Sequence, residues 1–297
     1  MISRLLLSLK KTVLPIYIYM FYPIAKRLLK DYDILNSVET VYKIKNGNLS
    51  ISRFGDGEYE ILRRRGTGFQ KADEKLATKL EFILHNPIDS LLICIPYALS
   101  TLDIFRPSSK RVWRSFICRN LRVVTRNTLK NYTYGDSLCT RFYMPLADKS
   151  KSMQVANLLK TLWAGRKVCI IEGEGTRLGV GNDLLLECIE VVRIICPSNN
   201  AFSKYDVIRN TINKDIPKDV LLLIALGMTA TVLSYDLTID GYQALDIGHI
   251  DVEYEWMRMG AIEKCSVQGR AVNELGNNNI EYIANSEYEN QIITRIL

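Results

Sequence analysis

Histidine is scarce in this sequence, and cysteine is not arranged for metal binding. The 297 residues include only two histidines, His85 and His249, and seven cysteines, no two of which form a CxxC pair. A structural zinc site with the usual cysteine and histidine ligands is therefore not expected. Because the number of cysteines is odd and several lie in apolar runs, we interpret them as small core residues of a protein in a reducing compartment.

No hydrophobic run is long enough to cross a membrane. The best candidate lies between Lys11 and Lys26, where fourteen mostly apolar residues include Pro15 and Pro23. A spanning helix needs about 20 apolar residues, and the two prolines are expected to interrupt one. The segment also lacks the small-residue cleavage site of a signal peptide, so secretion is not indicated and we expect a cytoplasmic protein.

Acidic residues are missing from the first thirty positions, which contain six lysines and arginines. The whole chain has a formal net charge of +7, so residues 31–297 carry only +1. A nearly neutral body gives little support for nucleic-acid binding. The apolar, aromatic and basic residues of positions 1–30 suit an amphipathic helix on an anionic membrane, here the inner face of the plasma membrane. The alternative is a first helix that packs on the domain.

The rest of the chain alternates strand-like and helix-like segments. Apolar, β-branched runs occur at 49–54, 91–96, 167–173, 191–197, 220–227 and 242–248. Most are continuous rather than alternating, which is typical of strands buried on both faces of a parallel sheet. Helices are expected at 73–86 and 153–163, where leucines, isoleucines and valines recur on one face. This order predicts a doubly wound, mostly parallel α/β sheet, whose ligands bind beyond the carboxyl ends of the strands.

The loop after the first of these runs reads RFGDGE and brings two carboxylates together. Asp56 and Glu58 lie beside Gly55 and Gly57, which leave the backbone free to bend so that both side chains can converge. Mg²⁺ and Mn²⁺ bind carboxylate oxygens together with substrate phosphates. Arg53 suits a site that also holds phosphate. A solvated acidic turn is the alternative.

A second loop, EGEGTRLGVGND, is rich in glycine and joins the runs at 167–173 and 191–197. Such a turn lets backbone N–H groups and a helix N-terminus approach a phosphate, and Arg177 adds a charge suited to a diphosphate. Asn182 or Asp183 is expected to cap a helix that follows. A glycine-rich turn of purely structural use is the alternative.

Nicotinamide dinucleotide binding is disfavoured on two counts. The glycines follow the spacing GxGxxxG rather than GxGxxG, and the next strand ends at CPSNN. A dinucleotide fold needs the second spacing and an acidic residue after that strand.

Two further loops follow the last two runs. Thr229 is placed to cap a helix after the run at 220–227. After the final run, Asp246, His249, Asp251 and Glu253 lie within eight residues. His249 beside acidic residues suits a proton carrier or a group that orients a substrate hydroxyl, although a lone histidine is more often structural.

Taken together, these loops resemble the GT-D fold glycosyltransferases of bacteria. The resemblance rests on five ordered motifs: RFGDGE (53–58), RLGVGND (177–183), CPSNNAF (196–202), LGMTATVLSYDL (226–237) and GYQALDIGHIDVEYEW (241–256). It covers a domain of about residues 38–262. Residues 1–37, the N-terminal segment, and residues 263–297, a C-terminal extension, lie outside it.

The resemblance implies a Rossmann-like fold, a UDP-sugar donor and a DxE motif that binds a divalent metal, Mn²⁺ or Mg²⁺. In this sequence the motif falls on Asp56 and Glu58. The resemblance further implies that two loops border the nucleotide, through Arg177, Gly179, Asn182, Pro197, Asn200 and Phe202. With Arg53, Gly55 and Thr229, these residues form the expected substrate-binding set.

The expected function is transfer of a hexose from a UDP-sugar to a glycan or lipid-linked glycan acceptor, in bacterial surface polysaccharide or glycoprotein glycan synthesis. If the reaction inverts the anomeric centre, Asp251 or His249 is the candidate base for the acceptor hydroxyl. Inversion and retention both stay open. The alternatives are a non-catalytic scaffold of a polysaccharide assembly and an NAD-dependent oxidoreductase on a Rossmann fold.

Overall fold

The computed structural model describes residues 2–272, 275 and 284–297, with side chains from Pro15 onward. Its described residues form one nine-stranded sheet in the order β1-β4-β3-β2-β8-β7-β5-β6-β9, and all the strand pairs are parallel. The strands are β1 (Asp33–Ile34), β2 (Ser50–Arg53), β3 (Leu91–Ile95), β4 (Thr133–Asp136), β5 (Lys167–Gly173), β6 (Glu190–Cys196), β7 (Leu221–Ala225), β8 (Ala244–Asp246) and β9 (Ile292–Arg295).

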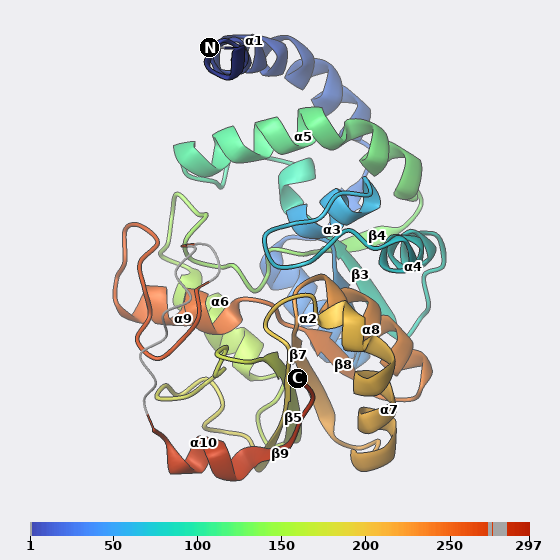
Figure 1. Cartoon of the computed structure of the whole chain (residues 1–297), viewed down its shortest axis with the longest axis vertical. Helices are drawn as coiled ribbons and strands as arrows, with labels where there is room; N and C mark the ends of the chain where they lie inside the picture. The colour runs from blue at the N-terminus through green and yellow to red at the C-terminus, as the bar shows by residue number, and fades with distance from the viewer. Residues whose placement is uncertain (1, 273–274, 276–283) are drawn as a thin grey trace.

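Helices cover both faces of this sheet (Figure 1). They are α1 (Ile2–Leu29), α2 (Ser37–Gly47), α3 (Asp56–Leu62), α4 (Glu74–His85), α5 (Pro107–Asn127), α6 (Ser152–Lys160), α7 (Tyr205–Asp215), α8 (Met228–Ile239), α9 (Ile250–Arg258) and α10 (Ser286–Gln291). Two clusters of buried side chains lie between the sheet and the helices. One includes side chains of α3, α4, α5, α7 and α8, and the other includes side chains of α2, α6 and α9. The predicted doubly wound α/β class is confirmed.

The predicted strands and helices are found where the apolar runs lie. Along β5, Cys169 and Ile171 enter one cluster while Val168 and Ile170 enter the other, so the strand is buried on both faces. Helix α4 begins as the sequence suggests, because the side chain of Asp73 accepts a hydrogen bond from the backbone N–H of Leu76 at 3.0 Å.

The helix expected after the glycine-rich loop is absent, and this prediction was wrong. Residues 174–189 form hydrogen-bonded turns. Their carbonyls accept from other elements: the indole N–H of Trp163 donates to Leu184 and the backbone N–H of Gly165 donates to Glu187, each at 2.7 Å. Neither Asn182 nor Asp183 therefore caps a helix.

The N-terminal segment forms one helix, α1, and Pro15 and Pro23 do not interrupt it, contrary to expectation. Both prolines lie on the exposed side, where water can hydrate the carbonyl that each leaves without a partner. Ala25 and Leu29 are buried, and α1 lies along α5 on the side away from the sheet (Figure 1). Among the described residues, the structure contains no helix with the length and apolarity to span a bilayer.

Both flanking segments add strands to the sheet. Within residues 1–37, β1 pairs with β4, and within the C-terminal extension β9 pairs with β6 at the other edge.

Candidate active site

The central strand β2 marks a reversal in the chain connections. From β2 the chain continues to its neighbour β3 on one side, whereas from β8, the neighbour on the other side, it continues to β9 at the opposite edge of the sheet. Such a reversal in a parallel sheet leaves a crevice beyond the carboxyl ends of the strands, where ligands bind. Arg53 ends β2 and Asp246 ends β8, so both stand at this switch point.

Arg53 is fully engaged at the switch point. Its guanidinium forms an ion pair with Asp246 at 2.9 Å and donates to the carbonyl of Ser137 at 2.9 Å and the hydroxyl of Thr140 at 2.8 Å. A Cβ built on Gly248, whose φ is +48°, would lie 1.9 Å from Arg53 Nη2, so only glycine fits there. The arginine therefore holds the loop after β8 against β2 rather than pointing freely at a substrate.

Glu58 is a buried carboxylate on the first turn of α3. Its Oε2 accepts a hydrogen bond from the backbone N–H of Gly55 at 2.7 Å, and its Oε1 lies 3.4 Å from the hydroxyl of Thr231. Burial raises its pKa to about 7, and the negative charges of Asp246 and Asp56 add to the shift. A nearby cation would stabilise the charged form of this group.

Asp56 is the exposed first residue of α3, two positions before Glu58. The described residues contain no cluster of three or more histidine, cysteine, aspartate or glutamate side chains arranged for a metal. Two carboxylates nonetheless fit Mg²⁺ or Mn²⁺, because these ions keep several waters and take substrate phosphates as their other ligands. Glu58 is buried and Asp56 is exposed, and each carboxylate is a hard oxygen donor.

The start of α8 lies against the start of α3. A Cβ on Gly57 would lie 3.1 Å from the side chain of Met228, the first residue of α8. Thr229 does not cap this helix as expected: the N-cap is Gly227, and the Thr229 hydroxyl is buried without a hydrogen-bond partner among the described residues. Phe69 covers Gly227, because a Cβ there would lie 2.6 Å from the phenyl ring.

Asn200 joins the loop after β6 to the loop that carries Phe69. It adopts a left-handed conformation, its N–H donates to the Phe69 carbonyl at 2.7 Å, and its side-chain oxygen accepts from Gln70 at 2.8 Å. Pro197 begins this loop and is half-buried, while Phe202 is buried. These contacts place the CPSNNAF residues beside the start of α8.

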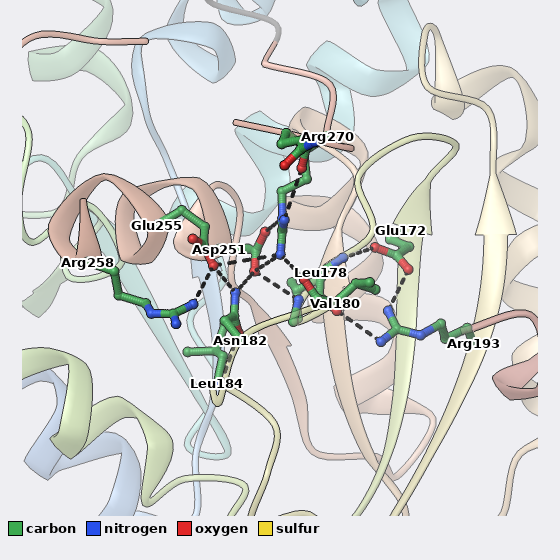
Figure 2. A network of polar contacts seen from close by, with 12 residues as sticks. Glu172, Leu178, Val180, Asn182, Leu184, Arg193, Asp251, Glu255, Arg258 and Arg270 are labelled. Carbon is green, nitrogen blue, oxygen red and sulfur yellow. Dashed lines mark hydrogen bonds and ion pairs between the residues drawn. The ribbon is translucent and has the colours of Figure 1, made fainter. Parts of the chain in front are cut away.

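Asp251 organises the glycine-rich loop (Figure 2). Its Oδ1 accepts from the Gly179 N–H at 2.9 Å and from the Asn182 amide at 2.8 Å, and the Arg270 guanidinium pairs with its Oδ2. The Asn182 amide also donates to Glu255 at 2.6 Å. Burial raises the pKa of Asp251, while Arg270 opposes the shift. A carboxylate with both oxygens taken is suited to holding this loop rather than to accepting a proton.

Arg177 lies in the same loop and turns toward the C-terminal segment. Its guanidinium carbon lies 4.8 Å from the ring centre of Tyr288, and that of Arg193 lies 4.9 Å from the same ring. Arg193 forms a buried ion pair with Glu172 at 2.7 Å. Residues of β5, β6 and α10 thus fix the base of the loop.

His249 immediately precedes α9 and is half-buried. It follows Gly248, which contacts Arg53, so it lies at the crevice end of β8. Of the two candidate bases, His249 therefore stands next to the switch point, whereas Asp251 is enclosed in the loop network.

Sequence reasoning missed several residues that build this region. Arg270 and Tyr288 lie outside the motifs, and no local pattern marks them as partners of Asp251 and Arg177. Gln70 is buried in a segment with no strand or helix signal. By contrast, Asp246 and its partner Arg53 each lie at the end of a predicted strand and within a motif, so the sequence marks both.

Comparisons with known proteins identify the family to which this parallel sheet, with its acidic pair and glycine-rich loop, belongs. The family described as "Glycosyltransferase GT-D fold" matches residues 51–275. This chain therefore belongs to the GT-D fold glycosyltransferase family. Its described residues outside that range include all of α1, β1, α2, α10 and β9.

Two curated streptococcal relatives are similar to most of this chain. One is "Probable glycosyl transferase Gly" of Streptococcus gordonii, 35% identical over 86% of this chain and 37% of its own length. The other is "Glycosyltransferase GlyD" of Streptococcus pneumoniae serotype 4, 38% identical over 87% of this chain and 32% of its own length. The chain thus spans about a third of the length of these relatives.

Solved structures are similar to almost the whole chain. One, described as the highly conserved domain of unknown function 1792 with a distinct glycosyltransferase fold, has a TM-score of 0.88 and 37% identity, and the match covers 92% of this chain and 98% of that one. Another, described as a new glycosyltransferase from Streptococcus sanguinis, has a TM-score of 0.86 and 33% identity, covering 90% and 100%.

Proposed function

We propose that this protein is a metal-dependent glycosyltransferase that moves a hexose from a UDP-sugar to a glycan acceptor in bacterial surface polysaccharide or glycoprotein glycan synthesis. The observation that carries the proposal is the acidic pair at the switch point. Glu58 is buried with a pKa raised to about 7, and Asp56 stands exposed on the same helical turn. A buried acid with a raised pKa in a crevice is typical of a functional site.

Asp56 and Glu58 would hold Mn²⁺ or Mg²⁺. When bound, such an ion offsets the negative charge that develops on a diphosphate leaving group. Gly55 donates its N–H to Glu58 and so fixes the direction of that carboxylate. Arg53 supports the site indirectly. Its ion pair with Asp246 joins the ends of β2 and β8, where the loops after these two strands begin.

The loops after β5 and β6 would border the nucleotide. Asn200 ties its loop to Phe69, beside Gly227 at the start of α8, and Asp251 fixes Gly179 and Asn182. No side chain of the described residues caps the start of α8 at Gly227, and the N-terminus of a helix suits a phosphate. Arg177 supports this edge through Tyr288.

His249 is the proposed proton acceptor for the attacking hydroxyl if the reaction inverts configuration. It lies at the crevice end of β8, and histidine is the side chain that most often serves as a general base. Asp251 is proposed as a positioning residue for the loop, since Arg270, Gly179 and Asn182 occupy its oxygens.

We further propose a cytoplasmic location, with residues 1–30 at the inner face of the plasma membrane. Support comes from the exposed apolar side of α1 and the basic residues at its end, Lys26, Arg27 and Lys30. A lipid-linked glycan would then be a suitable acceptor.

A donor screen tests the proposal. UDP-glucose, UDP-galactose and their N-acetyl forms are each added with Mn²⁺, and thermal shift and UDP release are measured. NAD in place of the UDP-sugar is the control for the oxidoreductase alternative. Stabilisation by a UDP-sugar with metal-dependent UDP release supports the transferase. UDP binding without release or transfer points to the scaffold, and stabilisation by NAD alone to the oxidoreductase.

A further inference from the structure

Helix α5 presents a basic face to solvent. Its 21 residues include six lysines and arginines and no acidic residue. Five of the basic residues are exposed: Arg111, Arg114, Arg119, Arg122 and Arg126. The opposite side of the helix, with Trp113 and Phe116, is buried in the core. Within the part of the chain that the structure describes, no carboxylate forms an ion pair with these five arginines.

Helix α1 lies alongside α5 (Figure 1). The hydroxyl of Tyr17 lies 3.5 Å from the carbonyl of Cys118, and the guanidinium of Arg114 lies 5.4 Å from the ring centre of Tyr22. Ala25 and Leu29 continue the same inward stripe and are buried. The two helices therefore form one surface, although 77 positions separate the end of α1 from the start of α5 in the sequence.

The outward side of α1 is apolar where it is described. Tyr19 is 84% exposed and Met20 63% exposed, and these two are joined by other large apolar side chains. The others are Ile16, Phe21, Ile24 and Leu28. We call these side chains, with the exposed arginines of α5, the α1–α5 face. Large apolar side chains gathered on a surface mark an interaction site.

We propose that the α1–α5 face docks on an anionic lipid bilayer, with the apolar side chains of α1 among the headgroups and the arginines of α5 on lipid phosphates. Arginine binds phosphate through a planar fork of donors. Aromatic and aliphatic side chains on one side of a helix beside basic residues are typical of interfacial binding. A nucleic acid would use the arginines but would leave the apolar side of α1 in water, so a bilayer fits the whole face better.

Docking would hold the candidate active site near the bilayer. Helix α5 packs on α3: the rings of Tyr59 and Phe116 lie 5.3 Å apart, and Arg63 lies 3.4 Å from Asn120. Helix α3 begins at Asp56, so one helix layer connects the docking face to the acidic pair. A membrane-attached acceptor follows from this arrangement. That consequence rests on the proposed transferase activity, whereas the docking extends the membrane location proposed for residues 1–30 and adds α5 to the binding face.

The test is co-sedimentation of the full-length protein with vesicles of phosphatidylcholine, with and without phosphatidylglycerol, at low and high salt. One variant carries Arg111→Gln, Arg119→Gln, Arg122→Gln and Arg126→Gln. The matched control removes the same charge from exposed lysines of α2, α4 and α7, with Lys43→Gln, Lys45→Gln, Lys75→Gln and Lys214→Gln. A third variant, Tyr19→Ser with Met20→Ser and Ile24→Ser, reduces the apolar side of α1.

The wild type and the lysine control are expected to bind the anionic vesicles equally at low salt. The arginine variant should bind at least about tenfold more weakly, since each basic residue near an anionic surface contributes roughly fivefold. The serine variant should also lose binding. Circular dichroism and the thermal shift with UDP and Mn²⁺ should match the wild type throughout, which separates docking from donor binding.

Three results would overturn the docking proposal. The first is a wild type that stays in the supernatant with anionic vesicles. The second is an arginine variant that binds like the wild type while deletion of residues 1–30 abolishes binding, because α5 then plays no part. The third is a dimer in light scattering that the serine variant converts to monomer, because a second copy would then cover the face.

Discussion

Arg53 and Asp246 are 193 positions apart in the sequence, and their side chains meet at 2.9 Å where β2 and β8 end. The side chain of Asp246 is nearly inaccessible, with 3% exposed, and the side chain of Arg53 is 13% exposed. The backbone carbonyl of Asp246 also accepts from Arg53 Nε at 2.6 Å. This pair links the two strands that flank the crevice, and the acidic pair of α3 lies directly beyond it.

Arg53→Met should strongly lower the free energy of unfolding. The substitution leaves Asp246 buried without its counter-charge, which costs about 3–5 kcal/mol in comparable pairs. Urea denaturation followed by circular dichroism measures the loss. The control is Arg64→Met, which removes solvent-exposed pairs with Glu74 and Glu81 and should cost about 1 kcal/mol or less. Equal losses in both variants would show that the switch-point pair has no special role.

Asp136→Asn should change how stability depends on pH. Burial raises the pKa of Asp136 to about 6, while bonds from Ser37, Leu138 and Tyr97 oppose the shift. The carboxyl therefore favours folding fully below its unfolded pKa near 3.8, and that contribution is lost as pH rises through about 6. As pH rises from 3.8 to about 6, the free energy of unfolding of the wild type should therefore fall relative to that of the variant.

Ser37→Ala is the companion to that measurement. The Ser37 hydroxyl donates to Asp136 at 2.6 Å, and its removal should raise the pKa of Asp136 further. The pH range of the stability loss should then move upward. If the free energy of unfolding depends on pH in the same way in the wild type and in Asp136→Asn, then Asp136 is not the group that causes the pH dependence.

Asp56→Asn and Glu58→Gln should each abolish Mn²⁺-dependent release of UDP from a donor sugar while the protein stays folded. Both changes keep the size of the side chain, and glutamine can still accept the Gly55 N–H. The control is Glu60→Gln on the same helix, whose carboxylate pairs with Arg63. The readouts are UDP release and thermal shift with Mn²⁺ and UDP. Wild-type turnover in either acidic-pair variant would remove the pair from the metal site.

His249→Gln and Asp251→Asn should impair the enzyme in different ways. His249→Gln should lower kcat by roughly 10²–10⁴-fold with little change in KM, as expected for loss of a general base. Asp251→Asn weakens the hold of Arg270 on the glycine-rich loop, so it should raise the donor KM and lower the melting temperature. It should leave the pH profile of kcat unchanged. If the Asp251 variant alone shifts that profile, the two roles are reversed.

The sequence by itself determined most of the sheet. Continuous apolar runs predicted β2, β3 and β5 to β8, because a strand buried on both faces has no polar side. Asp73 predicted the start of α4, because a helix cap is a local interaction. The short strands β1, β4 and β9 were missed, since two to four residues carry little periodic signal. The acidic pair was found because both members lie within one motif.

The tertiary structure decided what depends on distant partners. The segment after Asp183 was expected to form a helix, yet Trp163 and Gly165 donate to the carbonyls of Leu184 and Glu187, which a helix would use. The motif made Asp251 a candidate base, whereas in the structure Arg270 and the N–H of Gly179 donate to its carboxylate oxygens. Residues 31–297 have almost no net charge, so the sequence did not single out the basic residues of α5. The fold places these residues beside α1. Local patterns record propensity, whereas hydrogen bonding and burial are settled only when segments far apart in sequence meet.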